Sequence, residues 1–325
     1  MASETASDVL TTILYVHGFR GSKHSFAQLP ADLDRCLNCR LPGHRFISLV
    51  PIFSRIQSWQ EVETATLDLC NYLRQLALGS SPDQVDSSTP MLHTIARTAA
   101  PTRAVRVVLI AHSMGGLVVA DALRILMDSM HASHVPGIDD TITPLGVITL
   151  DTPYFGLSAD VLAINTEPAA HALLALLFAA ALTAGAPLPF WMKTGLAAVA
   201  VMGGLVAAAP HVKPYREFLK PLFLESMEAR VQKIRCMLRR DVPIKCYYST
   251  AQKPNEDRKC RFISVPAKLP LDVAQCFTAV DTALICPIDA HAHMVDRKAG
   301  ESVYATFLAG VADEISNWLH ARSVE

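Results

Sequence analysis

Ser113 lies between two runs of sequence that favour different secondary structures. The run before it, Val105 to Ile110, is rich in β-branched residues, and the run after it, Gly116 to Met127, is apolar and helix-forming. Ala111 and Gly115, two positions before and after the serine, are small enough to let a strand and a helix come close together. A serine in this setting is typical of a nucleophile elbow, a strained turn that exposes a hydroxyl group for attack on a carbonyl carbon.

A serine nucleophile requires a base, and histidine is the usual one. The sequence has 12 histidines, so chain order must select among them. His291 and His293 follow an expected strand, Phe262 to Val265, and precede an expected closing helix, Tyr304 to Leu319. His320 falls at the end of that helix, where we expect it to be exposed. The base is therefore His291 or His293. The same pair could suit a metal, but no carboxylate set accompanies it.

The histidine needs an acid to orient it, and the sequence offers several. Asp151 ends an expected strand, Leu145 to Leu150, and is our first candidate. It could instead serve only as a turn acid, because it precedes a Thr-Pro pair. The alternatives are Asp257, which follows Glu256 in a later loop, and Asp281, ten residues before His291.

The reaction also needs hydrogen-bond donors for the developing oxyanion. An expected strand from Thr11 to Val16 runs into His17-Gly18-Phe19, and Gly18 permits a sharp backbone turn there. Such a strand end is the usual position of an oxyanion loop. The backbone amides of Phe19 and Met114 are therefore our candidate donors.

Strands and helices alternate along the chain. Besides the elements already named, further strands are expected at Arg45–Val50 and Ile244–Tyr248, with helices at Ser58–Leu78 and Pro214–Arg239. Ser80 to Arg103 is rich in turn-forming residues and is expected to be an exposed loop, with a short helix around Met91–Arg97. This alternation predicts an α/β fold with a mostly parallel sheet and helices on both of its faces.

The composition is that of a packed enzyme without a nucleic-acid partner. The 325 residues are 51% hydrophobic and 18% charged, with a net charge of −1. The N-terminus has no basic, apolar secretion signal, so we expect a cytoplasmic protein with reduced cysteines. Cys36 and Cys39 form a CxxC motif without a second pair nearby to complete a zinc site, so we expect no metal there. Catalysis by a serine, a histidine and an acid needs no metal or organic cofactor, and we expect none.

An unusually apolar segment spans residues 168–210. Residues 169–186 contain no charged side chain, and residues 191–209 contain only Lys193. Each part is close to the ~17–25 residues that span a bilayer. The segment could be a helical lid over the site, a hairpin attached to a membrane, or a buried helix pair. We accordingly divide the chain into residues 1–156 and 213–325 of one α/β domain, separated by a helical insertion at 157–212.

Four stretches together resemble the α/β-hydrolase superfamily, and more narrowly the lipase-like serine esterase domains of fungal hydrolases. The stretches are His17-Gly18-Phe19-Arg20-Gly21, the Ser113 elbow, Leu150-Asp151-Thr152-Pro153-Tyr154-Phe155-Gly156-Leu157, and Ala290-His291-Ala292-His293-Met294. Those domains similarly follow the elbow with Asp-Thr-Pro-aromatic-x-Gly and end with Ala-His-x-x-Met. That register favours His291 as the base. Val295 departs from the family, which often has phenylalanine after the methionine. The resemblance extends from about Thr11 to Leu319.

This resemblance implies a serine hydrolase that cleaves carboxylic esters, with acyl or lipid-like substrates favoured by the apolar insertion. Ser113 would be the nucleophile, His291 the base and Asp151 the acid. One alternative is an enzyme that cleaves thioesters or amides with the same residues. Another is a non-catalytic scaffold with the same fold that binds a membrane or a partner through residues 168–210.

Overall fold

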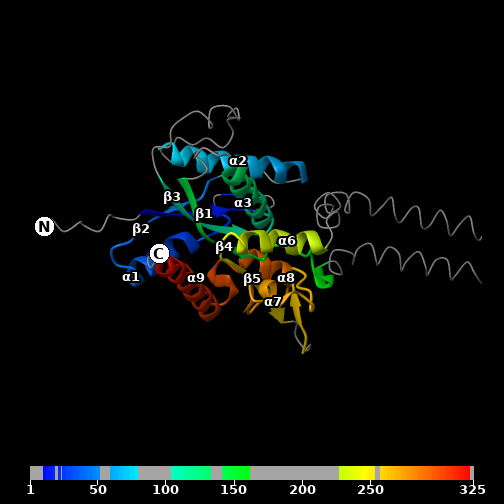
Figure 1. Ribbon diagram of the computed structural model, residues 1–325. Coiled ribbons are helices and arrows are strands. Elements are labelled where there is room, and N and C mark those ends of the chain that lie inside the picture. Colours follow the sequence, from blue (N-terminus) through cyan, green and yellow to red (C-terminus); the bar gives the residue numbers. More distant parts are fainter. Residues whose placement is uncertain are drawn as a thin grey trace, which may run out of the picture.

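Seven strands of the described part of the chain form one sheet at the centre of the molecule (Figure 1). The computed structural model describes residues 10–18, 21–22, 24–51, 59–79, 104–132, 141–161, 227–252 and 257–322. The strands are β1 (Leu10–Val16), β2 (Arg45–Leu49), β3 (Val105–His112), β4 (Ile142–Leu150), β5 (Ile244–Gln252), β6 (Lys259–Arg261) and β7 (Phe277–Asp281).

The sheet is parallel except at one pair of strands. Its order is β2-β1-β3-β4-β5-β6, and β7 also pairs with β5. Among the strand pairs that the structure describes, only β5–β6 is antiparallel. Because parallel strands end at the same edge of a sheet, the residues that follow β1, β3 and β4 are brought to one edge. His17, Ser113 and Asp151 are the residues in those three positions.

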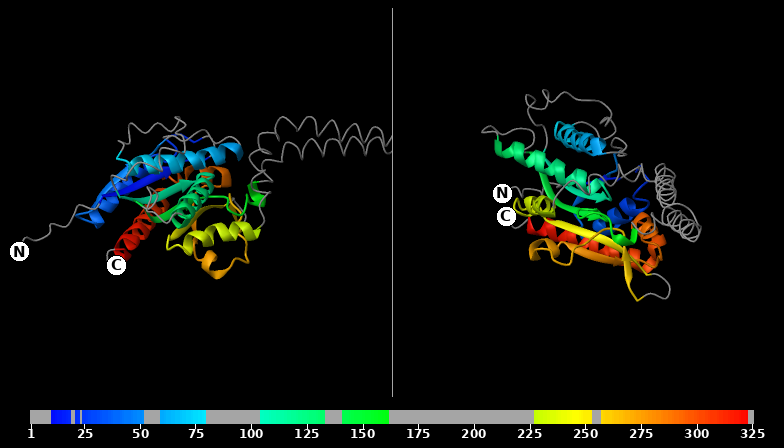
Figure 2. Two further views of the ribbon diagram at one scale, coloured as in Figure 1. Left: turned by 45° about the horizontal axis from the view of Figure 1, so that its top comes forward. Right: turned by 90° about the vertical axis from the view of Figure 1, so that its right-hand side faces the viewer.

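Helices cover both faces of the sheet, as the views in Figures 1 and 2 show. The helices are α1 (Leu29–Arg40), α2 (Trp59–Ala77), α3 (Gly115–Ala132), α6 (Met227–Leu238), α7 (Leu271–Ala274), α8 (Pro287–His293), η4 (Arg297–Ala299, a 3-10 turn) and α9 (Glu301–Ala321). Helices α2, α3 and α6 pack on one face, and α1 and α9 pack on the other.

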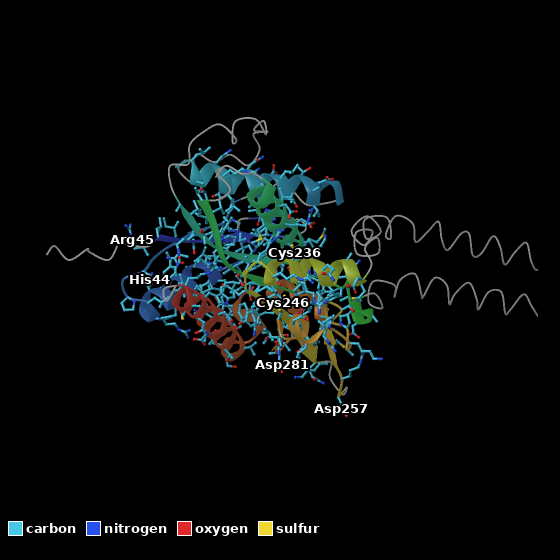
Figure 3. The ribbon with its side chains drawn as sticks, viewed as in Figure 1. His44, Arg45, Cys236, Cys246, Asp257 and Asp281 are labelled. Carbon is cyan, nitrogen blue, oxygen red and sulfur yellow. The ribbon has the colours of Figure 1, made fainter. Side chains whose placement is uncertain are left out.

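Alternate residues of the central strands point to opposite faces of the sheet and pack under the helices on each face. Side chains fill the space on both sides of the sheet (Figure 3). In β3, Val107 and Leu109 join the core under α2, α3 and α6, whereas Val108 and Ile110 join the core under α1 and α9. A continuous apolar run is expected for a strand that is buried on both faces.

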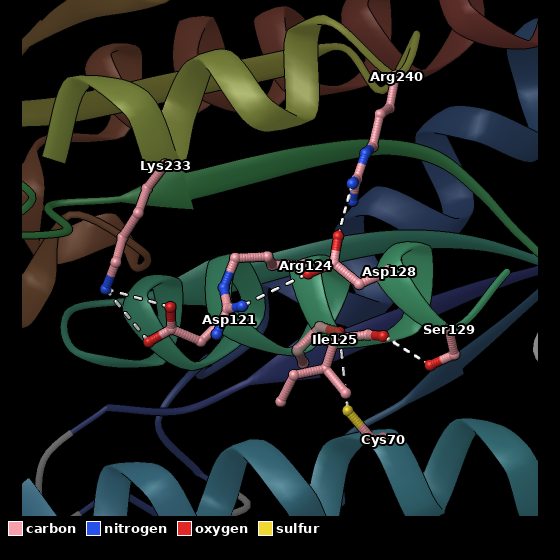
Figure 4. Close-up of polar contacts among 9 residues, drawn as sticks. Cys70, Asp121, Arg124, Ile125, Asp128, Ser129, Lys233 and Arg240 are labelled. Atoms are coloured by element: carbon pink, nitrogen blue, oxygen red, sulfur yellow. Dashed lines mark hydrogen bonds and ion pairs between the residues drawn. The ribbon is translucent and has the colours of Figure 1, made fainter. Parts of the chain in front are cut away.

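Ion pairs join α6 and the turn after it to the neighbouring α3 (Figure 4). Lys233 Nζ lies 3.1 Å from Asp121 Oδ1, and Arg240 Nη2, just beyond α6, lies 2.6 Å from Asp128 Oδ1. These contacts fix how α6 lies along α3, the helix that begins directly after Ser113.

The predicted α/β architecture is confirmed, with one strand placed wrongly. The expected strand at Phe262–Val265 is not one, because β6 ends at Arg261. The chain bends there, and the Ser158 amide donates to the Phe262 carbonyl at 2.9 Å while the Ser264 amide donates to the Gly156 carbonyl at 2.9 Å. Residues 262–264 therefore bond to the segment after β4 instead of extending the sheet. Helix α1 and strand β7 were not predicted.

Several expectations fall outside the described residues. These include the loop at Ser80–Arg103, the apolar segment 168–210 and the first part of the helix expected at Pro214–Arg239. Within the described ranges, no helix combines the length and the apolar character needed to cross a membrane.

Candidate active site

The turn between β3 and α3 holds Ser113 in a strained conformation. Its φ is +56°, in the left-handed region that non-glycine residues rarely occupy. Its amide donates to the Leu150 carbonyl at 2.8 Å, which ties the turn to the end of β4. A Cβ atom added at Gly115 would lie 2.3 Å from the Val16 carbonyl oxygen. The turn therefore requires a glycine two residues after the serine.

The end of β1 lies directly against this turn. A Cβ atom added at Gly18 would lie 2.6 Å from the Ser113 Cβ and 3.1 Å from the Met114 nitrogen. In the part of the chain that the structure describes, the Met114 amide donates no hydrogen bond. It is therefore an available donor beside the serine. Phe19, the other predicted oxyanion donor, lies outside the described residues.

Asp151 and His291 are brought together at the same edge of the sheet. The imidazole Nδ1 of His291 lies 3.3 Å from Asp151 Oδ2. Asp151 is fully buried, and its φ of +48° is also in the left-handed region. The Ser249 amide donates to Oδ1 at 2.8 Å, and the Ser249 hydroxyl donates to Oδ2. These bonds satisfy a carboxylate that would otherwise be costly to bury.

The His291 ring is packed between two other rings. The Phe262 ring lies parallel to it, with centroids 3.6 Å apart and an interplanar angle of 8°. The His112 ring also stacks on the His291 ring, with centroids 4.5 Å apart and an interplanar angle of 24°. Because a ring at 3.6 Å covers one face of the imidazole, His112 must occupy the other face.

His112 also contacts the backbone of His291. Its Nε2 lies 3.0 Å from the His291 carbonyl oxygen. Burial, and secondarily the charge of His291, lowers the pKa of His112 to about 3. The ring is therefore neutral near pH 7. Since a carbonyl can only accept, the Nε2–H of His112 is the donor.

Ser113 and His291 are connected through His112 and not by a direct hydrogen bond. Among the contacts of the described residues, none joins the Ser113 hydroxyl to an imidazole. Such bonds are often long in enzymes without substrate. The residue that precedes Ser113 instead holds the main chain of His291.

The alternative bases have other partners. His293 Nδ1 lies 3.0 Å from Asp296 Oδ2. Both His291 and His293 lie on helix α8 and not on a loop. Because successive helical residues are rotated by about 100°, residues two apart point in different directions, and here only His291 reaches Asp151. His320 is exposed and bonds to the Ser316 carbonyl.

The alternative acids lie away from His291. Asp281 Oδ1 accepts from the Thr250 hydroxyl at 2.7 Å, and Oδ2 lies 2.6 Å from Lys259 Nζ. The hydrogen bond from Lys259 lowers the pKa of this carboxyl. Asp257 is exposed beside β6, at the edge of the molecule (Figure 3). Glu256 lies outside the described residues.

The CxxC motif falls within helix α1, and the thiols of Cys36 and Cys39 are both free. Within the ranges that the structure describes, no group of three His, Cys, Asp or Glu side chains is arranged to hold a metal ion.

Sequence reasoning missed three residues that surround the Asp151–His291 pair. Ser249 is one of four hydroxyl-bearing residues in β5, with Tyr247, Tyr248 and Thr250, and Phe262 was assigned to a strand. His112 belongs to the elbow motif, but nothing in the motif indicates that its ring would contact His291. Only the pairing of distant segments brings these residues together.

Comparison with known proteins gives a family for the chain. Residues 8–173, just over half of the 325, match the model of the family described as "Putative serine esterase (DUF676)". No curated protein matches the sequence.

Solved structures with detectable similarity include lipase 1 from Pelosinus fermentans and phospholipase PlaB from Legionella pneumophila. The lipase is 15% identical with a TM-score of 0.33, and the match covers 75% of this chain and 69% of the lipase. PlaB in complex with thio-NAD is 14% identical with a TM-score of 0.28, and the match covers 47% of this chain. The chain spans only 27% of the length of PlaB.

The sheet order, the helices on both faces and the strand–serine–helix turn are those of an α/β-hydrolase fold. Together with the match over residues 8–173, they show that this chain belongs to the DUF676 serine esterase family.

Proposed function

We propose that this protein is a serine hydrolase that cleaves carboxylic esters, with Ser113 as nucleophile, His291 as general base and Asp151 as the orienting acid. The observation that carries the proposal is the 3.3 Å contact between His291 Nδ1 and the buried Asp151 carboxylate, at the sheet edge that also holds Ser113. Membership of the serine esterase family supports the same chemistry.

Asp151 orients His291 so that the imidazole can act as the base. A carboxylate that accepts from Nδ1–H leaves the lone pair on Nε2, which is the nitrogen that takes the serine proton. As His291 becomes positively charged, the buried carboxylate stabilises the imidazolium. Ser249 keeps that carboxylate oriented.

The reaction then follows two half-reactions. The Ser113 oxygen forms a bond to the ester carbonyl carbon while its proton passes to His291 Nε2. The amides of Met114 and Phe19 donate to the resulting oxyanion. The C–O bond to the alcohol breaks, and the alcohol leaves with the proton from His291. Water, deprotonated by the same histidine, then attacks the acyl-enzyme, and the acid and free Ser113 are released.

The substrate we propose is an acyl or lipid-like ester. The uncharged run at residues 169–186 supports this, because an apolar segment in the enzyme suits an apolar substrate. Attachment to a membrane through residues 168–210 is compatible with such a substrate and is part of the same proposal.

A fluorophosphonate probe tests the nucleophile and the base together, because it reacts only with an activated serine. We expect the purified wild-type protein to be labelled, Ser113→Ala to be unlabelled, and His291→Ala to react at least about 10³-fold more slowly. His293→Ala is the matched control, since it removes a histidine two residues away that contacts Asp296 and not Asp151.

Equal labelling of His293→Ala and wild type is expected. If His293→Ala lost labelling and His291→Ala kept it, the base would be wrongly assigned. A folded wild-type protein that is not labelled in buffer or in detergent would contradict the proposal and favour a non-catalytic scaffold.

A further inference from the structure

We propose that His112 is a positioning residue that sets the separation between the nucleophile and its base, by holding the main chain of His291 against the turn that carries Ser113. This inference rests on the proposed function, and it concerns a residue that neither gives nor takes a proton in the proposed reaction. Three independent observations support it.

The first is a hydrogen bond between distant segments. His112 precedes Ser113 directly, and its Nε2–H donates to the His291 carbonyl at 3.0 Å. The two residues are separated by 179 positions in the chain. One hydrogen bond and one peptide link therefore connect helix α8 to the serine. If this bond is lost, the position of α8 relative to the turn is no longer fixed from this side.

The second observation is the stacking of the rings. The His112 ring covers the face of His291 that Phe262 leaves free, so the imidazole cannot tilt freely toward either side. The Phe26 ring packs edge-on against the His112 ring, with centroids 6.5 Å apart and an interplanar angle of 76°. Phe26 is fully buried. The support for His291 is therefore anchored in the core.

The third observation is that His112 remains uncharged beside a histidine that must become charged. Burial, and secondarily the charge of His291, lowers the pKa of His112 to about 3, although Asp151 acts in the opposite direction. Within the described residues, these two are the ionisable groups that act on His112. A neutral ring can donate from Nε2 without repelling the imidazolium that forms on His291 during the reaction.

The expected effect is on proton transfer and not on substrate binding. A misplacement of a catalytic group by about 1 Å can lower the rate about 100-fold. We therefore expect loss of the donor to lower kcat and the rate of fluorophosphonate labelling while leaving KM unchanged.

Two substitutions separate the donor from the ring. His112→Phe keeps a ring for stacking but removes the hydrogen bond. His112→Gln removes the ring but places a carboxamide nitrogen near the position of Nε2, where it can donate to the same carbonyl. Labelling rates, and kcat and KM for a short-chain p-nitrophenyl ester, are measured for both variants and for wild type. We expect kcat to fall about 10- to 100-fold in His112→Phe and to be largely restored in His112→Gln.

A second measurement does not depend on activity. The proton on His291 Nδ1, shared with Asp151, gives a far-downfield proton NMR signal whose position reports the geometry of that pair. We expect the signal to shift or disappear in His112→Phe and to persist in His112→Gln. If the phenylalanine variant does not fold, His112→Asn replaces it, because its shorter amide cannot reach the His291 carbonyl.

The outcomes distinguish this inference from the proposed function. A folded wild-type protein that is not labelled contradicts the proposed function, and the NMR comparison still tests the His112 contact. If wild type is labelled and His112→Phe is labelled equally fast, with an unchanged NMR signal, the inference is overturned. It is also overturned if His112→Gln loses as much activity as His112→Phe while its melting temperature stays that of wild type.

Discussion

The carboxylate of Asp151 reaches His291 with both of its oxygens already bonded to one residue. The Ser249 amide holds Oδ1, and the Ser249 hydroxyl shares Oδ2 with the His291 ring. A substitution of the Ser249 side chain leaves its backbone N–H in place. The hydrogen bond from this amide to Asp151 Oδ1 can therefore remain in a variant of Ser249. The hydroxyl alone is therefore the adjustable part of this support.

We predict that Ser249→Ala lowers kcat about tenfold without changing KM. Loss of a hydrogen bond to a charged group costs about 1.5–3 kcal/mol, and about 1.4 kcal/mol corresponds to a tenfold change in rate. Without the hydroxyl, the carboxylate can rotate away from the orientation that suits His291. Steady-state kinetics with a soluble ester measure the effect.

Ser316→Ala is the control for this prediction, because the Ser316 hydroxyl bonds within α9 to the Ala312 carbonyl, away from the site. We expect this variant to retain wild-type kcat. A rise in KM with unchanged kcat in Ser249→Ala would show that Ser249 acts on substrate binding instead.

The candidate site could be predicted only as far as local signals allow. Ser113 lies in a motif of small residues, Asp151 ends a strand, and His291 follows in chain order. Ser249 and Phe262 carry no such signal, since each is of a common residue type. Their roles depend on contacts between segments far apart in sequence, such as the 98 positions that separate Ser249 from Asp151.

At the level of elements, the packing of α9 on the sheet depends on a glycine. Gly146 lies in β4, and a Cβ atom added there would lie 2.2 Å from Trp318 Cε3. Trp318 is a nearly buried residue of α9. The indole ring therefore occupies the space that a side chain at position 146 would fill.

We predict that Gly146→Ala destabilises the protein by about 1–3 kcal/mol, the usual range for overpacking a core. Trp318→Leu should make room for the added methyl group. The double variant should then be more stable than the sum of the two single effects implies, by at least about 0.5 kcal/mol. Urea unfolding of the four proteins measures this coupling. Strict additivity would mean that α9 moves away from β4 without difficulty.

The elements that could be predicted are those that carry a strong pattern of their own. Strands β1 and β3 contain the hydrophobic runs Ile13–Val16 and Val107–Ala111, and α3 follows a distinct turn motif. Strand β6 has only three residues and is defined by its pairing with β5, which the sequence of β6 does not reveal. Helix α1 has a polar composition, and only Leu29, Leu33 and Leu37 on its buried face indicate that it is a helix.

Considered as a whole, the molecule brings its candidate residues together through sheet topology. Parallel pairing carries the ends of β1, β3 and β4 to one edge, and β7 leads into α8, which carries His291. This part of the organisation follows from the alternation of strands and helices, which the sequence displays. Of the two rings that stack on His291, Phe262 is placed by the bend at residue 262 and His112 by the end of β3. Neither contact could be predicted in the same way.

The stability of the whole chain should depend on pH through His112. In the folded protein its pKa is lowered to about 3, mainly by burial, whereas an unfolded histidine has a pKa of about 6.5. Between these values the unfolded chain binds a proton that the folded protein does not. The free energy of unfolding therefore falls as the pH falls, by up to about 1.4 kcal/mol per pH unit.

We predict a loss of about 2 kcal/mol from this group between pH 7 and pH 5. Urea unfolding at the two pH values measures it in wild type and in His112→Gln, which has no group that titrates at this position. The difference between the two pH values should be smaller in the variant by about the same amount. An identical difference in both proteins would show that His112 is protonated as readily in the folded state as in the unfolded state.

The positive φ angles of Ser113 and Asp151 also bear on how such a chain evolves. For residues other than glycine, this conformation costs roughly 1–2 kcal/mol at each position. Glycine would adopt it without that cost. Selection for stability alone would therefore favour glycine at both positions and so remove the proposed nucleophile and acid together. A family member with glycine at the positions of Ser113 and Asp151 would therefore be one that is selected for folding stability and no longer for catalysis.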